Sequence, residues 1–274
     1  MSLLSTFFRN IFCIFLLLGC LHTYSQEVSQ GKFYTVEKIY PESQVDGYNL
    51  YLPPSYDEDS SGFPVIVFLQ GGLGVGGEVD IIYNWALPRI LKETQTLKTE
   101  LDQMRVNTFV YVMPHIRQGQ FYDNVPAISQ ILDEIESSYR IDPQRIYLTG
   151  LSRGGHGTWG LASKMPERFA AIVPISGDQQ GVTNYDSLAD LPIWAVHNPD
   201  DNIVKYDYTQ RAVTKIEAIA HTSFHQSESV AAADWENHTR IFTSSSNPRK
   251  PHDAWTEVYN DIDFYRWLLR FKKE

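Results

Sequence analysis

Cysteine is almost absent from this chain of 274 residues, and the two that occur, Cys13 and Cys20, lie within its first 25 positions. A mature chain that begins after them has no thiol, which excludes thiol catalysis, cysteine-ligated zinc and a disulfide framework. A chain of this length buries a sizeable core without crosslinks. We therefore expect a fold that its hydrophobic core alone stabilises.

Positive charge is also scarce, because 23 Lys and Arg stand against 33 Asp and Glu, a formal net charge of −10. An acidic surface repels nucleic-acid phosphates and anionic lipid headgroups. We expect neither as a partner. The sequence also lacks internal repeats, low-complexity tracts and long linkers, which predicts a single domain over residues 26–274.

The N-terminal segment has the sequence pattern of a targeting signal. Arg9 precedes the apolar run Ile11–Leu18, which is too short to span a bilayer comfortably. This pattern predicts a signal peptide over residues 1–25 with cleavage before Gln26, hence a secreted or periplasmic protein without a membrane span after cleavage. Two alternatives stay open: a lipoprotein box that makes a lipidated Cys20 the first residue, and an uncleaved membrane anchor.

Apolar runs alternate with helix-compatible segments through the rest of the chain. We expect strands at residues 33–39, 48–52, 63–70, 107–113, 145–149, 169–176, 193–197 and 239–243, and helices at 124–139, 206–220 and 255–271. Alternation of this kind predicts an α/β fold, a mainly parallel central sheet with helices on both faces. In such sheets ligands bind at the carboxyl ends of the strands.

One strand runs directly into the pentapeptide Gly150-Leu151-Ser152-Arg153-Gly154, and a helix-compatible segment follows. Strand, sharp turn and helix form the context that a nucleophile elbow requires. A glycine-rich turn is the alternative for the pentapeptide alone, but the flanking elements favour Ser152 as a nucleophile. A serine hydroxyl is a weak nucleophile and needs a base.

Histidine is the expected base, and in this fold the acid and then the base follow the serine along the chain. Six histidines follow Ser152: His156, His197, His221, His225, His238 and His252. His252 lies in the loop after the last expected strand, where the base belongs. His156 is too near Ser152 on the following helix, and His221 and His225 occupy a polar stretch that we expect to be solvent-exposed.

The acid should follow the strand at residues 193–197, where Asp200 and Asp201 are adjacent candidates. One of them should accept a hydrogen bond from the imidazole and fix its tautomer. We interpret Asp178 and Asp190 as turn residues. The oxyanion needs two backbone N–H groups, one from Arg153 and one from the loop at residues 70–77, whose five glycines allow close backbone approach.

These residues resemble those of α/β-hydrolases of the secreted bacterial esterase type. The matching stretches lie between Tyr48 and Phe271: residues 51–56, 67–71, 142–155, 169–172 and 252–257. They are similar to poly(3-hydroxybutyrate) depolymerases, feruloyl and acetylxylan esterases, and chains of the phospholipase/carboxylesterase or prolyl oligopeptidase-like kind. The resemblance implies an α/β-hydrolase fold without a large cap domain.

The resemblance also implies a catalytic set: Ser152 as nucleophile, His252 as base, Asp201 rather than Asp200 as acid, and the backbone N–H groups of Gly72 and Arg153 as oxyanion donors.

The sequence departs from the family pattern in three places. Gln70 replaces a histidine in the oxyanion loop, and we expect its side chain to order that loop. Arg153 follows the nucleophile; we expect a structural salt bridge, the alternative being recognition of an acidic acyl or sugar group. Residues 249–251, Arg-Lys-Pro, replace glycines before His252, which could stiffen or displace the base.

The resulting expectation is an exported serine hydrolase that cleaves carboxylic esters of small molecules or polysaccharides without a metal or an organic cofactor. Two alternatives stay open: a peptidase on the same fold, and a non-catalytic binding protein. No lid insertion is recognisable, which disfavours long-chain lipids as substrates. We expect Trp159, Trp194, Trp235 and Trp255 to belong to the core or the pocket wall.

Overall fold

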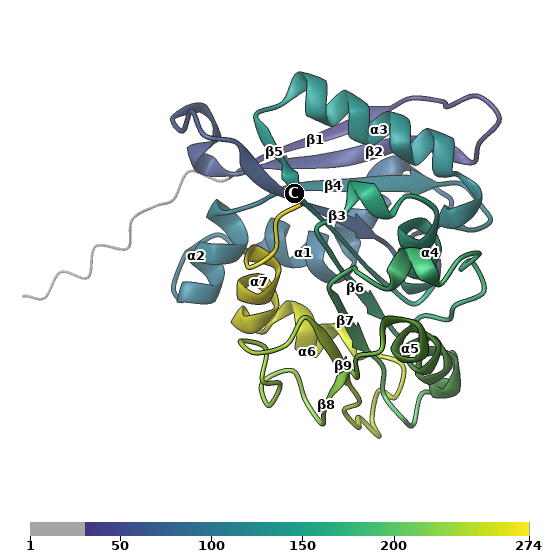
Figure 1. The fold of residues 1–274 in the computed structure, drawn as a ribbon. Helices are drawn as coiled ribbons and strands as arrows, with labels where there is room; N and C mark the ends of the chain where they lie inside the picture. Colours follow the sequence, from purple (N-terminus) through teal and green to yellow (C-terminus); the bar gives the residue numbers. More distant parts are fainter. Residues whose placement is uncertain (1–30, 274) are drawn as a thin grey trace, which may run out of the picture.

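A computed structural model describes residues 31–273, which form a nine-stranded sheet flanked by helices (Figure 1). The predicted signal peptide and the lipoprotein box at Cys20 lie outside the described residues. The strands are β1 Lys32–Glu37, β2 Val45–Leu52, β3 Phe63–Leu69, β4 Val110–Ile116, β5 Ile141–Leu151, β6 Ala171–Ile175, β7 Ile193–Val196, β8 His225–Ser227 and β9 Arg240–Thr243. The helices are α1 Ala86–Glu93, α2 Glu100–Asn107, α3 Val125–Ser138, α4 Arg153–Lys164, α5 Tyr206–Ala220, α6 Trp255–Tyr259 and α7 Ile262–Leu269.

The sheet has the strand order β1-β2-β4-β3-β5-β6-β7-β9-β8. β2 pairs antiparallel with β1 and β4, and every other pair in the described chain is parallel. This confirms the mainly parallel sheet. The carboxyl ends of β3, β5, β6, β7 and β9 therefore meet along one edge, where the loops that follow them lie close together.

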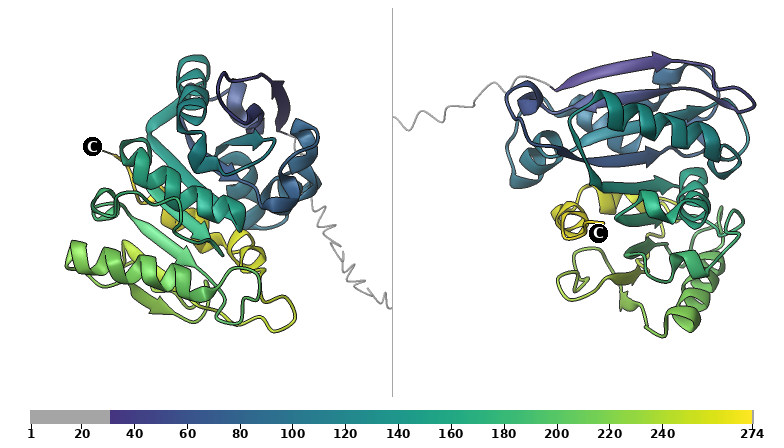
Figure 2. Two further views of the ribbon diagram at one scale, coloured as in Figure 1. Left: turned by 90° about the vertical axis from the view of Figure 1, so that its right-hand side faces the viewer. Right: turned by 45° about the horizontal axis from the view of Figure 1, so that its top comes forward.

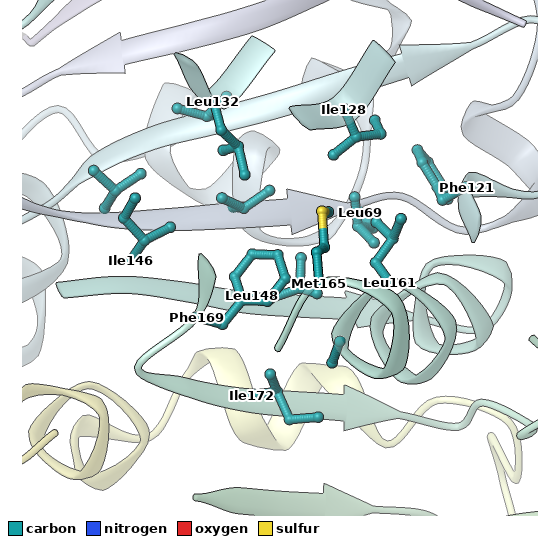
Figure 3. Packing of buried hydrophobic residues seen from close by; sticks show 14 of the residues in the cluster. Leu69, Phe121, Ile128, Leu132, Ile146, Leu148, Leu161, Met165, Phe169 and Ile172 are labelled. Atoms are coloured by element: carbon teal, nitrogen blue, oxygen red, sulfur yellow. The ribbon is translucent and has the colours of Figure 1, made fainter. Parts of the chain in front are cut away.

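Helices cover both faces of the sheet, as predicted, and each face has its own hydrophobic cluster (Figures 1 and 2). On one face lie α3, α4 and α5, and α4 packs against β3, β5 and β6; Figure 3 shows Ile128 and Leu132 of α3 in the same hydrophobic cluster as Leu148 of β5. On the other face lie α1, α2, α6 and α7. Because both faces are covered, β3 is almost wholly buried, which explains its continuous apolar sequence.

The predicted helix at residues 255–271 is wrong as a single helix. The structure divides it into α6 and α7 at Asn260 and Asp261. The Asp261 carboxylate accepts a hydrogen bond from the Asp263 amide at 2.9 Å and so caps a new helix. The Tyr259 carbonyl, at the break, accepts a hydrogen bond from Arg105 at 2.9 Å.

Two further differences from the predicted strands concern the start of β4 and the additional strand β8. β4 begins three residues after the predicted start at 107, because α2 extends to Asn107. The three-residue strand β8 occupies part of the polar stretch expected to be exposed, and pairs parallel with β9 at the sheet edge. No apolar alternation marks so short an edge strand, and its pairing with β9 is a long-range contact.

Candidate active site

Ser152 alone separates β5 from α4, and its backbone is strained, with φ 53° and ψ −116°. The glycines around it permit a very close approach of strand and helix. A Cβ at Gly154 would lie 1.9 Å from the Leu69 carbonyl oxygen, and one at Gly150 would lie 2.5 Å from the Gly154 carbonyl oxygen. Larger residues at either position would push α4 away from β3 and β5.

The structure brings Ser152, His252 and Asp201 together in one chain of hydrogen bonds. The Ser152 hydroxyl donates to His252 Nε2 at 2.9 Å, and His252 Nδ1 donates to the Asp201 carboxylate at 2.7 Å. The Asp201 side chain is inaccessible to solvent, whereas that of His252 is 19% exposed. The His252 imidazole is thus partly accessible to solvent, and the Asp201 carboxylate lies buried behind it.

Asp201 accepts four hydrogen bonds. The donors are His252 Nδ1 at 2.7 Å, His197 Nε2 at 3.1 Å, Ile203 N at 2.8 Å and Val204 N at 3.0 Å. Burial by itself would raise the pKa of the Asp201 carboxyl, but these two imidazoles and two backbone amides outweigh burial and hold that pKa well below its usual range. Asp200 is exposed and accepts only a long hydrogen bond from Ser246, at 3.4 Å.

The loop that carries His252 is fixed by donors from the ends of β6 and β7. Asn198 Nδ2 donates to the Pro251 carbonyl at 3.0 Å, and Ser176 Oγ donates to the His252 carbonyl at 3.1 Å. His252 is therefore not displaced by the Arg-Lys-Pro segment before it. Asn198, which directly follows His197, supplies one of these two donors.

The glycine-rich loop turns back over the serine in a short 3-10 helix, Gly72–Gly74. The Gln70 side-chain amide donates to the Gly74 carbonyl, so that Gln70 orders the loop as expected. Arg153 is the first residue of α4, where backbone N–H groups lack partners within the helix. The backbones of Gly72 and Arg153 thus lie on two segments that meet at Ser152.

The expected salt bridge of Arg153 is wrong for the described part of the chain, where no carboxylate oxygen lies within 4.0 Å of its guanidinium. Arg153 Nη1 instead donates to the Gly119 carbonyl at 2.8 Å. Its Nε and Nη2 atoms would lie 3.8 and 3.9 Å from a Cβ built on Gly72. The cation is thereby held over the glycine loop beside Ser152.

A cavity of about 140 Å³ opens beside Ser152 and His252. Its apolar lining consists of Phe68, Leu73, Trp85, Ala86, Leu151 and Trp255. The Trp255 ring also meets the His252 imidazole edge-to-face, with centroids 5.2 Å apart. Trp255 is thus pocket wall, as predicted, whereas Trp159 and Trp194 are buried in the core. The sequence reasoning missed Trp85, because no strand or motif precedes it.

The remaining candidate residues do not reach the Ser152 hydroxyl. His156 Nδ1 accepts a hydrogen bond from the Asp178 amide at 2.7 Å, and burial lowers the pKa of its imidazole. Asp178 accepts from the Gln180 amide in a turn, as expected.

His225 is half-buried in β8 and stacks on His238 with centroids 4.2 Å apart, so the expectation that it is solvent-exposed is wrong. His221 is exposed and Asp190 is exposed.

Within residues 31–273, no group of three His, Cys, Asp or Glu residues is placed to hold a metal ion. The helices of the same residues all lack the length and apolar composition that a membrane span needs. The prediction of metal-free chemistry is not tested by this finding.

Comparison with known proteins places the chain in a family. Residues 46–263 match the Esterase family, described as "Putative esterase", and the chain belongs to it. A bifunctional acetylxylan esterase/xylanase XynS20E from Neocallimastix patriciarum is 33% identical over 84 residues, which are 30% of this chain and 12% of that protein. The match thus spans about an eighth of that curated relative's length.

Solved structures show the fold. A thermostable esterase superposes with a TM-score of 0.66 at 22% identity, over 90% of this chain and 64% of that one. The feruloyl esterase module from Clostridium thermocellum superposes with a TM-score of 0.63 at 16% identity, over 87% and 88% of the two chains. The chain accordingly has the α/β-hydrolase fold, as predicted.

Proposed function

We propose that this protein is an exported serine hydrolase that cleaves carboxylic esters. One observation carries the proposal: Ser152, on a strained turn beside an apolar cavity, is hydrogen-bonded to His252, which is hydrogen-bonded to the buried Asp201. Membership of the Esterase family supports the same reaction class. The chemistry needs no metal or organic cofactor.

In the proposed mechanism His252 takes the proton of the Ser152 hydroxyl as the oxygen attacks the ester carbonyl. Asp201 holds the imidazole in the tautomer whose Nε2 accepts that proton, and stabilises the imidazolium that forms. The backbone N–H groups of Gly72 and Arg153 stabilise the tetrahedral oxyanion. His252 then protonates the leaving alcohol, and water releases the acyl group by the same steps.

The cavity supports a short acyl group. Its volume of about 140 Å³ is below the roughly 300–1,000 Å³ of ordinary small-molecule sites. The alcohol half of the ester would then remain outside, where a sugar or a polysaccharide has room. A carbohydrate ester is the substrate class that the acetylxylan esterase relative and the feruloyl esterase structure favour by their names.

Hydrolysis of p-nitrophenyl acetate, butyrate and octanoate by the protein from Gln26 onward tests the proposal. We expect activity on the two short esters, less on octanoate, and a loss of about 10⁶-fold in kcat for Ser152→Ala. Ser137→Ala, at an exposed serine on α3, is the matched control and should keep wild-type rates. Equal rates for Ser152→Ala and wild type would overturn the assignment.

The two other candidate functions predict distinct outcomes in two further assays of the same protein. Cleavage of aminoacyl-p-nitroanilides at rates above those of the esters would indicate a peptidase. Failure of a fluorophosphonate to label Ser152 would indicate a binding protein. The mass of the mature N-terminus separates cleavage before Gln26 from lipidation of Cys20.

A further inference from the structure

Arg153 is a cation without an anionic partner in the described part of the chain. It is half-buried at the start of α4, directly after Ser152, and no described carboxylate oxygen lies within 4.0 Å of its guanidinium. Its Nη1 donates to the Gly119 carbonyl at 2.8 Å, which holds the side chain but leaves its charge uncompensated. A guanidinium stays charged in proteins. The proposed site therefore has a fixed positive charge beside its nucleophile.

The guanidinium keeps two donors available on one edge. Nε–H and one Nη2–H of an arginine are parallel, and this fork matches the two oxygens of a carboxylate. The Gly119 carbonyl engages only Nη1 of Arg153, and no hydrogen bond of the described residues engages its Nε or Nη2. Neither atom belongs to the buried polar atoms that lack a partner in residues 31–273. Both are therefore accessible to solvent and to a ligand.

The same two atoms border the glycine loop at the cavity. A Cβ built on Gly72 would lie 3.8 Å from Arg153 Nε and 3.9 Å from its Nη2. Apart from Gly72 and its neighbours in the chain, no other heavy atom of the described structure lies within 4 Å of that point. Gly72 lines the cavity beside Ser152, whereas Arg153 is not part of the lining. An anion bound by the fork would therefore lie at the rim of the cavity.

The acid and the imidazole next along this side of the site are bonded to each other. The Asp178 carboxylate accepts from the Gln180 amide at 3.0 Å and lies 3.4 Å from His156 Nδ1, so it faces His156 and not Arg153. His156 Nδ1 accepts from the Asp178 amide at 2.7 Å, and burial lowers the pKa of this imidazole. Neither group competes with Arg153 for an anion or supplies one to it.

We propose that Arg153 is a specificity-determining residue whose Nε–H and Nη2–H fork binds a carboxylate on the alcohol half of the ester, so that acylated uronic-acid sugars are the preferred substrates. This inference rests on the proposed esterase function. The apolar cavity of about 140 Å³ receives the acyl group. The alcohol half then lies at the rim, where the guanidinium is. The formal net charge of −10 repels an acidic sugar from most of the surface, and the cation beside Ser152 attracts it to the nucleophile.

Two esters that differ by one charge test the proposal. 4-Acetoxybenzoate and 4-acetoxybenzamide share the acetyl group and the ring, and only the first has a carboxylate. In Arg153→Gln we expect the ratio of their kcat/KM values, acid over amide, to fall about tenfold below the wild-type ratio. Because the carboxylate is bound alike in the ground state and the transition state, the ratio should change mainly through the KM of the acid. The ratio cancels any general effect of the substitution on the oxyanion site.

Arg117→Gln is the matched control. Arg117 is an exposed arginine that likewise donates to a backbone carbonyl, that of Ser43 at 3.2 Å, and it is not part of the cavity lining. The ratio should keep its wild-type value in this variant. An unchanged ratio in Arg153→Gln would overturn the proposal. An equal fall in both variants would overturn it as well, because the overall charge of the protein would then set the preference.

A second substitution keeps the test decisive if Arg153→Gln does not fold. Arg153→Lys keeps the charge but lacks the fork. We expect the ratio of acid to amide to fall in this variant too, by a smaller factor than in Arg153→Gln. A wild-type ratio in Arg153→Lys would contradict binding by the fork.

Further substrates locate the carboxylate. p-Nitrophenyl hemisuccinate has its carboxylate on the acyl half, and p-nitrophenyl butyrate is its neutral counterpart. A loss in Arg153→Gln that is confined to the hemisuccinate would overturn the assignment to the alcohol half. Acetylated polygalacturonate and acetylated xylan extend the comparison to polymers. We expect the wild type to release acetate faster from the polygalacturonate, and faster release from the xylan would contradict the uronic-acid class.

A binding measurement separates this inference from the proposed function. If the wild type hydrolyses no ester, the proposed function fails, and NMR titration of Ser152→Ala with the same two acetoxy compounds still decides the role of Arg153. We expect the acid to bind more tightly than the amide, and the difference to vanish in the double variant with Arg153→Gln. Equal affinity of Ser152→Ala for the two compounds would overturn the proposal.

Discussion

At the scale of single residues, two adjacent aspartates with the same chemistry have opposite surroundings. Asp201 is buried and accepts four hydrogen bonds, while Asp200 points to solvent. The difference arises because the turn after β7 directs the second carboxylate toward the backbone amides of Ile203 and Val204. Those amides hold the carboxylate in place before the imidazole is considered.

We expect Asp201→Asn to lower kcat on p-nitrophenyl acetate by about 10⁴-fold, because an amide stabilises the wrong tautomer of His252. Asp200→Asn is the matched control and should stay within about threefold of wild type, since exposed substitutions away from such contacts have small effects. Steady-state kinetics with both variants checks this. Comparable losses in the two would contradict the assignment of the acid.

At the scale of elements, the turn between β5 and α4 requires strand and helix backbones to touch. The glycine pattern around Ser152 is therefore a packing requirement as much as a requirement of the turn. α4 lies against β3, β5 and β6, and its first turn crosses the end of β3. The position of the serine hydroxyl thus depends on how closely this helix seats on the sheet.

Gly154→Ala should destabilise the protein by about 3 kcal/mol or more, because its Cβ would overlap the Leu69 carbonyl. Gly119→Ala is the comparison, because a Cβ there meets no atom within 4 Å. Its loss of stability should come only from placing alanine at a φ of +77°, which costs about 1 kcal/mol. Denaturant unfolding of both variants measures the two costs. A smaller loss in Gly154→Ala than in Gly119→Ala would show that α4 moves freely.

At the scale of the whole molecule, the sheet brings together groups that are far apart along the chain. Ser152 and His252 are 100 residues apart, and Asp201 and His252 are 51 apart. They meet because β5, β7 and β9 end at the same edge of the sheet. Protonation of one buried carboxylate at that edge therefore affects the stability of the entire fold.

The free energy of unfolding should fall as the pH decreases from about 5 towards 2, in part because of Asp201. Its pKa is held lower in the folded than in the unfolded chain, so its contribution is complete above the unfolded value of about 3.9 and is lost below it. Asp201→Asn lacks this contribution. Its free-energy difference from wild type, measured by chemical denaturation across this range, should shrink with falling pH, and a constant difference would contradict the expectation.

Much of the fold was predictable from local patterns. The helix predicted at residues 206–220 coincides with α5, and the one at 124–139 differs from α3 by one residue at each end. Both have apolar residues at helical spacing that face a single core. The break at Asp261 was not predicted, because a polar cap within an apolar helical pattern has a weak local signal.

The sequence by itself determined the alternation of elements, the glycines that permit the turn at Ser152, and the placement of the adjacent Asp200 and Asp201, and of His252, in loops that follow strands. These follow from short-range sterics and from the apolar spacing of single segments. Only the tertiary structure decided that Asn198 and Ser176 hold the His252 loop, that Trp85 lines the cavity, and that His197 bonds Asp201. Each is a contact between segments brought together by the packing of the sheet, and no spacing along the chain encodes it.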